Sequence, residues 1–275
     1  MERKMQKRNS EGILFRMKAS IGGLLNRINK KWAILAVVVV LIVLIVLGVR
    51  AAWPKEDTGV AQGVSHLKEL EAKDMVAVEK EVKQVRKEAR AEALANGTLP
   101  VWAQFSDYVI FGDSRTVGFS YHEFLDEQRI LADGGLTIAD IPNYMDQMKT
   151  LNPSYLFLCT GLNDVSIGYW NTPEEYVTAF EEQMQALMEL LPDTQIYINS
   201  IFPAQDPAFE RSSAWRNIPD YNVAVKAWCE EKGYHYIDNT QVYEEHKDLY
   251  DEDGIHFKKE FYEYWAMNML TEVEM

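Results

Sequence analysis

Two separated segments of the chain hold the residue types that nucleophilic acyl transfer requires. Ser114 ends the segment Phe111-Gly112-Asp113-Ser114, and His256 ends the segment Asp253-Gly254-Ile255-His256. An acid three residues before a histidine can turn back and hydrogen-bond to one ring nitrogen. The other nitrogen can then accept the proton of a serine hydroxyl that attacks a carbonyl carbon. Either segment by itself would be an ordinary turn or loop.

Two further segments could stabilise the oxyanion that such an attack creates. The segment Asp133-Gly134-Gly135-Leu136-Thr137 contains glycines, which let the backbone approach a substrate oxygen and donate an N–H to it. The segment Thr160-Gly161-Leu162-Asn163-Asp164 offers the side-chain amide of Asn163 for the same purpose. Taken singly, both segments are also compatible with ordinary turns.

Alternating strands and helices are expected from about Leu99 onward. The apolar, β-prone runs are Tyr108–Phe111, Arg129–Ala132, Tyr155–Cys159, Gln195–Ile201 and Tyr234–Ile237. The helical patterns are Thr116–Asp126, Ile138–Lys149, Pro173–Leu191, Ile218–Lys232 and Lys258–Thr271. This alternation predicts a parallel sheet covered by helices on both faces. Sites in such folds lie beyond the carboxyl ends of the strands, where three of the four segments are expected.

The order of the four segments resembles the four blocks of the SGNH (GDSL-like) hydrolase family. Those blocks centre on Gly-Asp-Ser, a Gly, Gly-x-Asn-Asp and Asp-x-x-His, and all four occur here in that order over about Asp107–Glu272. The resemblance implies an α/β fold, a three-layer α/β/α sandwich with a five-stranded parallel sheet, as in the flavodoxin-like SGNH hydrolases.

The same resemblance implies roles for the residues that could act on a carbonyl. Ser114 would be the nucleophile, His256 the general base and Asp253 the carboxylate that orients it. Asp251 is a less favoured rival for Asp253, because its spacing to the histidine differs. No metal and no organic cofactor is implied.

The oxyanion hole implied by the resemblance consists of Gly135 and Asn163, with Gly134 as a rival for Gly135. One position departs from the family pattern, because Gly-Asp-Ser-Leu is Gly-Asp-Ser-Arg here. Arg115 could contact a charged or sugar substrate, but a salt bridge to one of the many acidic residues is the favoured interpretation.

The expected activity is that of an extracytoplasmic serine esterase that removes O-acetyl or other short acyl groups from cell-envelope glycans. An O-acyltransferase using the same acyl-enzyme is the first alternative. A non-catalytic carbohydrate-binding or scaffold module on the same fold is the second, and the complete set of four segments argues against it. A lipase is disfavoured because no long apolar lid segment is present.

Charge is distributed unevenly along the chain. Its 275 residues carry a formal net charge of −14, yet residues 1–31 hold nine basic and two acidic side chains. The remainder is therefore strongly acidic and would repel a phosphate backbone, which excludes a nucleic-acid binder. A basic arm ahead of an acidic body instead indicates two different environments.

An apolar segment, Trp32–Val49, separates the arm from the body. As a helix it would span about 27 Å, close to the thickness of a hydrocarbon core. Residues 32–53 are therefore expected to form a single-pass membrane anchor, with the arm (1–31) in the cytoplasm and the catalytic domain (99–275) outside. A cleaved signal peptide is the competing interpretation, disfavoured by the length of the apolar run.

Residues 54–98 are expected to form a linker and a helix from Ser65 to Ala95. Apolar residues recur in that helix at spacings of three and four. A solvated stalk, a helix lying on the catalytic domain, and a weakly self-associating coiled coil all fit this pattern. Cys159 and Cys229 are expected to be buried small hydrophobes, with a single disulfide as the alternative.

Overall fold

The computed structural model describes residues 32, 35, 38–47 and 58–273. The chain divides into two units, Met1–Ala77 and Val78–Met275. The basic arm and part of the expected anchor at 32–53 lie outside the described residues, so both stay predictions. Among the residues that are described, no helix is long and apolar enough to cross a membrane.

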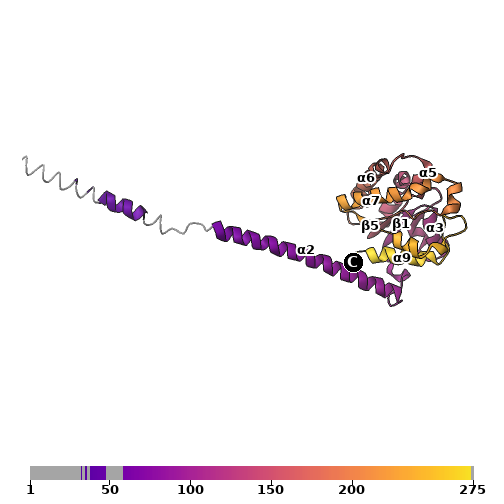
Figure 1. Cartoon of the computed structure of the whole chain (residues 1–275), viewed down its shortest axis with the longest axis horizontal. Coiled ribbons are helices and arrows are strands. Elements are labelled where there is room, and N and C mark those ends of the chain that lie inside the picture. The colour runs from indigo at the N-terminus through magenta and orange to yellow at the C-terminus, as the bar shows by residue number, and fades with distance from the viewer. Residues whose placement is uncertain (1–31, 33–34, 36–37, 48–57, 274–275) are drawn as a thin grey trace, which may run out of the picture. The chain divides into compact units, whose positions relative to one another are not determined.

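A five-stranded parallel sheet forms the centre of the second unit, as predicted (Figure 1). The strands are β1 (Tyr108–Gly112), β2 (Ile130–Ala132), β3 (Tyr155–Cys159), β4 (Gln195–Asn199) and β5 (His235–Ile237). They lie in the order β2-β1-β3-β4-β5, and every neighbouring pair is parallel. At the carboxyl edge, Gly112 pairs with both Ala132 and Cys159. The loops that follow the first three strands therefore start side by side.

Helices cover both faces of the sheet, which makes three layers. Side chains alternate across each strand: Val109 and Phe111 of β1 belong to one apolar cluster, whereas Tyr108 and Ile110 belong to the other. The first cluster packs beneath α4 (Ile141–Leu151), α5 (Leu162–Ile167), α6 (Pro173–Leu190) and α7 (Ile218–Lys232). The second packs beneath α3 (Ser114–Tyr121), α8 (Thr240–Glu245), α9 (Phe261–Glu272) and the end of α2 (Thr58–Ala95).

Short 3₁₀ segments connect these elements. They are η1 (Trp102–Gln104), η2 (Glu127–Arg129), η3 (Ile138–Asp140), η4 (Asp206–Glu210), η5 (Ser213–Asn217) and η6 (Lys247–Leu249). The helix predicted over Ile138–Lys149 is thus η3 followed by α4. Helices α5 and α8 were not expected from the sequence, because each has only six residues and too short a periodic pattern.

The last part of α2 packs on the catalytic domain. Leu94 is buried in the second cluster, and Lys87 forms an ion pair with Glu272 of α9. Val82 and Val85 of the predicted apolar stripe are exposed, so self-association through this helix stays a prediction. Cys159 and Cys229 are both buried and free, and they lie in different clusters, which excludes the alternative of a disulfide.

Candidate active site

Ser114 is the first residue of α3, directly beyond the carboxyl end of β1. The carboxylate of Asp113 accepts a hydrogen bond from the N–H of Arg115 at 3.0 Å and so caps the helix. The helix was predicted to begin at Thr116, but this cap starts it two residues earlier. The hydroxyl of Ser114 is thereby held at a helix N-terminus, where the partial positive charge of the helix favours an anion.

His256 contacts both of the residues expected to work with it. Its Nε2 lies 2.9 Å from Oγ of Ser114, and its Nδ1 lies 2.6 Å from Oδ2 of Asp253. The other carboxylate oxygen of Asp253 accepts the N–H groups of Ile255 at 2.8 Å and of His256 at 2.9 Å. Asp253, and not its rival Asp251, therefore turns back onto the histidine.

The environment of Asp253 keeps its carboxylate charged. Burial raises its pKa, but hydrogen bonds from the backbone and ring of His256 and from the backbone of Ile255 outweigh burial, so the net pKa lies below its ordinary value. An ionised Asp253 holds the proton on Nδ1 of His256. Nε2 is then left as the acceptor that faces Ser114.

The two candidate oxyanion segments are tied to each other. Asn163 lies in α5 and donates its side-chain amide to the carbonyl of Leu136 at 3.0 Å. Gly135 precedes that carbonyl, is exposed, and has a φ of +85°, which favours glycine. Because β2, β1 and β3 are neighbours, these segments and Ser114 share one edge of the sheet. The oxyanion roles of Gly135, or of its rival Gly134, and of Asn163 stay predictions.

Asp164 is a site residue that the sequence analysis treated only as part of a turn. Its side chain is fully buried, and Oδ1 accepts the N–H of Ile138 at 2.9 Å. Burial raises its pKa to about 7, and the neighbouring Asp113 adds to the shift. Asn163 and Asp164 together hold the segment that follows β2 against the start of α5. The Asn-Asp pair was the available sequence signal, but burial cannot be inferred from it.

Arg115 contradicts both interpretations offered for it. Its side chain is only 3% exposed, so it cannot be a surface contact for substrate, and it forms no salt bridge with any acidic residue that the structure describes. Instead Nε donates to the carbonyl of Ile255 at 2.9 Å, and one terminal nitrogen donates to the carbonyl of Phe202 at 2.6 Å. Its guanidinium also lies 5.2 Å from the ring centre of Phe257. Arg115 thus binds the backbone of the loop that carries His256.

An open depression of about 410 Å³ lies beside Ser114 and His256. Its walls come from α3 and from the loop before α9, and include the charged or polar side chains of His122, Asp251 and Lys259. Tyr121 lines the same depression and is 78% exposed. The nucleophile therefore faces an open surface that combines charged and aromatic side chains.

Comparison with known proteins decides the family. The sequence profile of the GDSL-like lipase/acylhydrolase family matches residues 110–264, more than half of the chain. The chain belongs to this family. All five of the predicted site residues lie inside the matched region. This GDSL-like protein is a hydrolase that acts on esters.

Solved structures with a similar fold include several esterases. The acetyl xylan esterase AlAXEase is 21% identical, with a TM-score of 0.45 over 61% of this chain and 100% of its own. Axe2, an acetylxylan esterase from Geobacillus stearothermophilus, is 16% identical, with a TM-score of 0.47 over 62% and 95%. A GDSL-like lipase from Bacteroides thetaiotaomicron is 14% identical, with a TM-score of 0.47 over 66% and 95%. No curated protein sequence matches the chain significantly.

Proposed function

We propose that this acylhydrolase is a serine esterase whose catalytic triad is Ser114, His256 and Asp253. The observation that carries the proposal is the continuous contact from Oδ2 of Asp253, through both ring nitrogens of His256, to Oγ of Ser114. A binding module on the same fold would have no need for that proton pathway.

In the proposed reaction, His256 Nε2 takes the proton of Ser114 as Oγ attacks the ester carbonyl carbon. The imidazolium that forms is stabilised by ionised Asp253 and then protonates the leaving alcohol. The N–H groups of Ser114 and Gly135 and the amide of Asn163 would hold the oxyanion. Water attacks the resulting acyl-serine with His256 again as base, which releases the acid and restores the enzyme.

We further propose that the ester is a short acyl group, such as acetyl, on a hydrated glycan. The depression beside Ser114 supports this, because it is open, has charged walls and presents the exposed ring of Tyr121. A long acyl chain would instead gain from a deep apolar pocket. The predicted anchor and basic arm favour a glycan of the cell envelope, with the catalytic domain outside the membrane.

Acetate release from O-acetylated envelope glycan tests the proposal, together with hydrolysis of acetyl and octanoyl chromogenic esters. Ser114→Ala and His256→Ala should each abolish both reactions, and the acetyl ester should be the better small substrate. Ser120→Ala is a matched control, because Ser120 lies on the same helix and donates to the carbonyl of Val117. Near-wild-type rates in both triad variants would remove the catalytic assignment, and a preference for octanoyl would remove the acyl-length assignment.

A further inference from the structure

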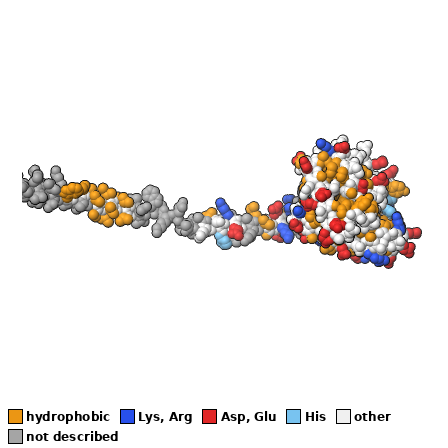
Figure 2. Space-filling model, turned by 90° about the horizontal axis from the view of Figure 1, so that it is seen from above, with side chains coloured by type: hydrophobic (Ala, Val, Ile, Leu, Met, Phe, Trp, Pro, Cys, Tyr) orange, Lys and Arg blue, Asp and Glu red, His pale blue; other side chains and the backbone are white. Residues whose placement is uncertain are grey.

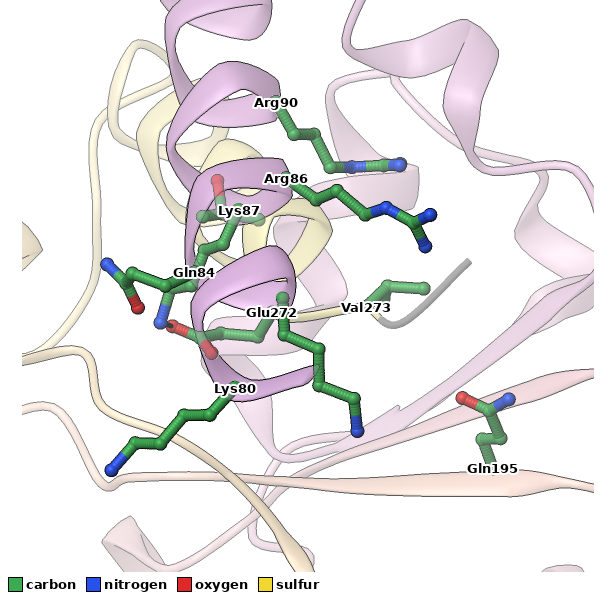
Figure 3. A pocket seen from close by; sticks show the side chains of 10 residues that line it. Lys80, Gln84, Arg86, Lys87, Arg90, Gln195, Glu272 and Val273 are labelled. Atoms are coloured by element: carbon green, nitrogen blue, oxygen red, sulfur yellow. Dashed lines mark ion pairs between the residues drawn. The ribbon is translucent and has the colours of Figure 1, made fainter. Parts of the chain in front are cut away.

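A groove of about 640 Å³ lies beside the start of β4 (Figure 3). It is bounded by α2, by the end of α9 and by Gln195. Gln195 is the first residue of β4, whereas Ser114 follows the last residue of β1. Strands of five residues span roughly 17 Å, so the groove is a separate feature from the candidate active site.

The charge of the groove is opposite to that of the chain. Five basic side chains of α2 line it, and among the described residues of its lining Glu272 is acidic. The basic residues are Lys80, Lys83, Arg86, Lys87 and Arg90. Glu272 is already paired with Lys87. Lys83 lies 3.9 Å from Glu79, an exposed pair that solvent screens. The described residues of the lining therefore carry more positive than negative charge, in a chain of net charge −14.

Among the groove residues, Arg90 gives the strongest indication that the groove binds an anion. Its Nε and one terminal nitrogen are buried and have no hydrogen-bond partner among the described residues. Burial lowers the pKa of this guanidinium, which nevertheless stays charged at neutral pH. A carboxylate or phosphate that accepted both N–H groups would satisfy these donors with charge-assisted hydrogen bonds.

The basic side chains form a row and not a single cluster. Lys80, Lys83, Lys87 and Arg90 follow spacings of three and four and therefore share one face of α2 over about 15 Å. Figure 3 shows Arg86 and Arg90 extending to the same side of the helix, the side on which Val273 lies. A single small anion would occupy only a part of such a row.

We propose that this groove binds a linear polyanion, whose carboxylate or phosphate groups are held by Arg86 and Arg90 and whose further charges follow the row toward Lys80. The site is distinct from the esterase site and does not depend on the proposed hydrolysis. It would hold a polymer on the catalytic domain at the edge opposite to the nucleophile.

Binding of the full-length chain to immobilised polygalacturonate and polyphosphate tests the proposal, with neutral dextran as the blank. The basic arm of residues 1–31 would also attract polyanions, so the readout is the difference between variants. Lys80→Gln/Arg86→Gln should weaken binding at least tenfold and flatten its salt dependence. The control Lys149→Gln/Lys232→Gln removes two exposed basic residues elsewhere and should leave binding unchanged. The two polymers show whether carboxylate, phosphate or either is accepted.

Arg90→Met separates a binding role from a structural one. Methionine fills a similar space and removes the two buried N–H groups that lack a partner among the described residues, so the melting temperature should stay equal or rise while polyanion binding weakens. A structural arginine would behave in the opposite way, with a lower melting temperature and unchanged binding. Either that result or a failure of the wild type to bind both polymers would overturn the proposal. The proposal would also be overturned if the groove double variant and the control double variant bound equally well.

Discussion

Three ionisable residues close to the nucleophile are buried. Asp113, Arg115 and Asp164 are each at most 3% exposed. Burial raises the pKa of Asp113, and the charge of Arg115 partly offsets that shift. Each residue bonds to backbone of a segment that carries a candidate site residue. The active-site geometry therefore depends on buried charges as well as on the triad.

Arg115 should act as a positioning residue for His256. Arg115→Met removes the hydrogen bond to the carbonyl of Ile255, so the imidazole should lose its alignment with Ser114. We expect kcat on the acetyl ester to fall at least tenfold with little change in KM, since an effect on alignment acts on the chemical step. Arg115→Lys, which can keep one carbonyl contact, should recover a part of kcat at a similar melting temperature. Full turnover in Arg115→Met would contradict this role.

Asp164 should make the stability of the protein depend on pH. Its pKa is about 7 in the folded chain against an ordinary value of 3.8, so between these values the folded state binds more protons than the unfolded state. Stability should therefore fall as pH rises from about 4 to 7, by a contribution on the order of 4 kcal/mol.

Asp164→Asn keeps an oxygen for the N–H of Ile138 and removes the titration. Urea denaturation at pH 5 and pH 8 should show a smaller loss of stability in this variant than in the wild type. Because the pKa of Asp113 is also raised, the stability of the Asp164→Asn variant should still depend on pH to some extent. Equal pH dependence in the two proteins would show that Asp164 is not the group responsible.

At the scale of the element, the turn from β3 into α5 is tightly constrained. Gly161 has a φ of +125°, and a Cβ there would lie 2.3 Å from Cγ1 of Ile201. Only glycine fits both conditions. Its carbonyl accepts the N–H of Val165 at 3.0 Å and so starts the helix that presents Asn163.

Gly161→Ala should therefore disturb both stability and turnover. The strain of a positive φ at alanine and the clash with Ile201 should together lower the free energy of unfolding by about 2–4 kcal/mol. Urea denaturation measures this change. Gly233→Ala is the matched control: Gly233 also has a positive φ, +74°, but its Cβ would meet nothing within 4 Å. We expect Gly233→Ala to lower the free energy of unfolding by about 1 kcal/mol and to leave turnover normal. Equal losses of stability in the two variants would mean that the side chain of Ile201 can move away from the added methyl group without destabilising the fold.

At the scale of the whole molecule, half of the 28 basic residues lie in two segments, nine in the arm of residues 1–31 and five in the groove along α2. Figure 2 shows acidic side chains spread over the visible face of the catalytic domain. In the topology proposed above, the negative surface of the domain would be repelled by anionic lipid, and the positive arm would be attracted to the anionic cytoplasmic leaflet.

The proposed topology predicts the outcome of limited proteolysis on intact cells. Protease added from outside should digest residues 99–275 and spare the basic arm, which antibodies against each end can detect. Permeabilised cells, in which both ends become accessible, provide the control. Recovery of a soluble, processed chain beginning near Ala51 would instead show a cleaved signal peptide.

The sequence by itself determined the alternation of strands and helices, the five-stranded parallel sheet and the four segments of the candidate site. These features follow from local properties: side-chain periodicity, glycine in turns, and the three-residue spacing from Asp253 to His256. The same local signals were insufficient for α5 and α8, whose six residues cover less than two helical turns.

Only the tertiary structure decided the strand order, the burial of Asp164 and the partners of Arg115. The hydrogen bonds of Arg115 join it to Ile255 and Phe202, residues 140 and 87 positions away. A motif shows that a residue is present, but its pKa and its partners depend on which distant backbone groups the fold brings against it. For that reason Arg115, next to the nucleophile in sequence, acts on the histidine loop and not on the substrate.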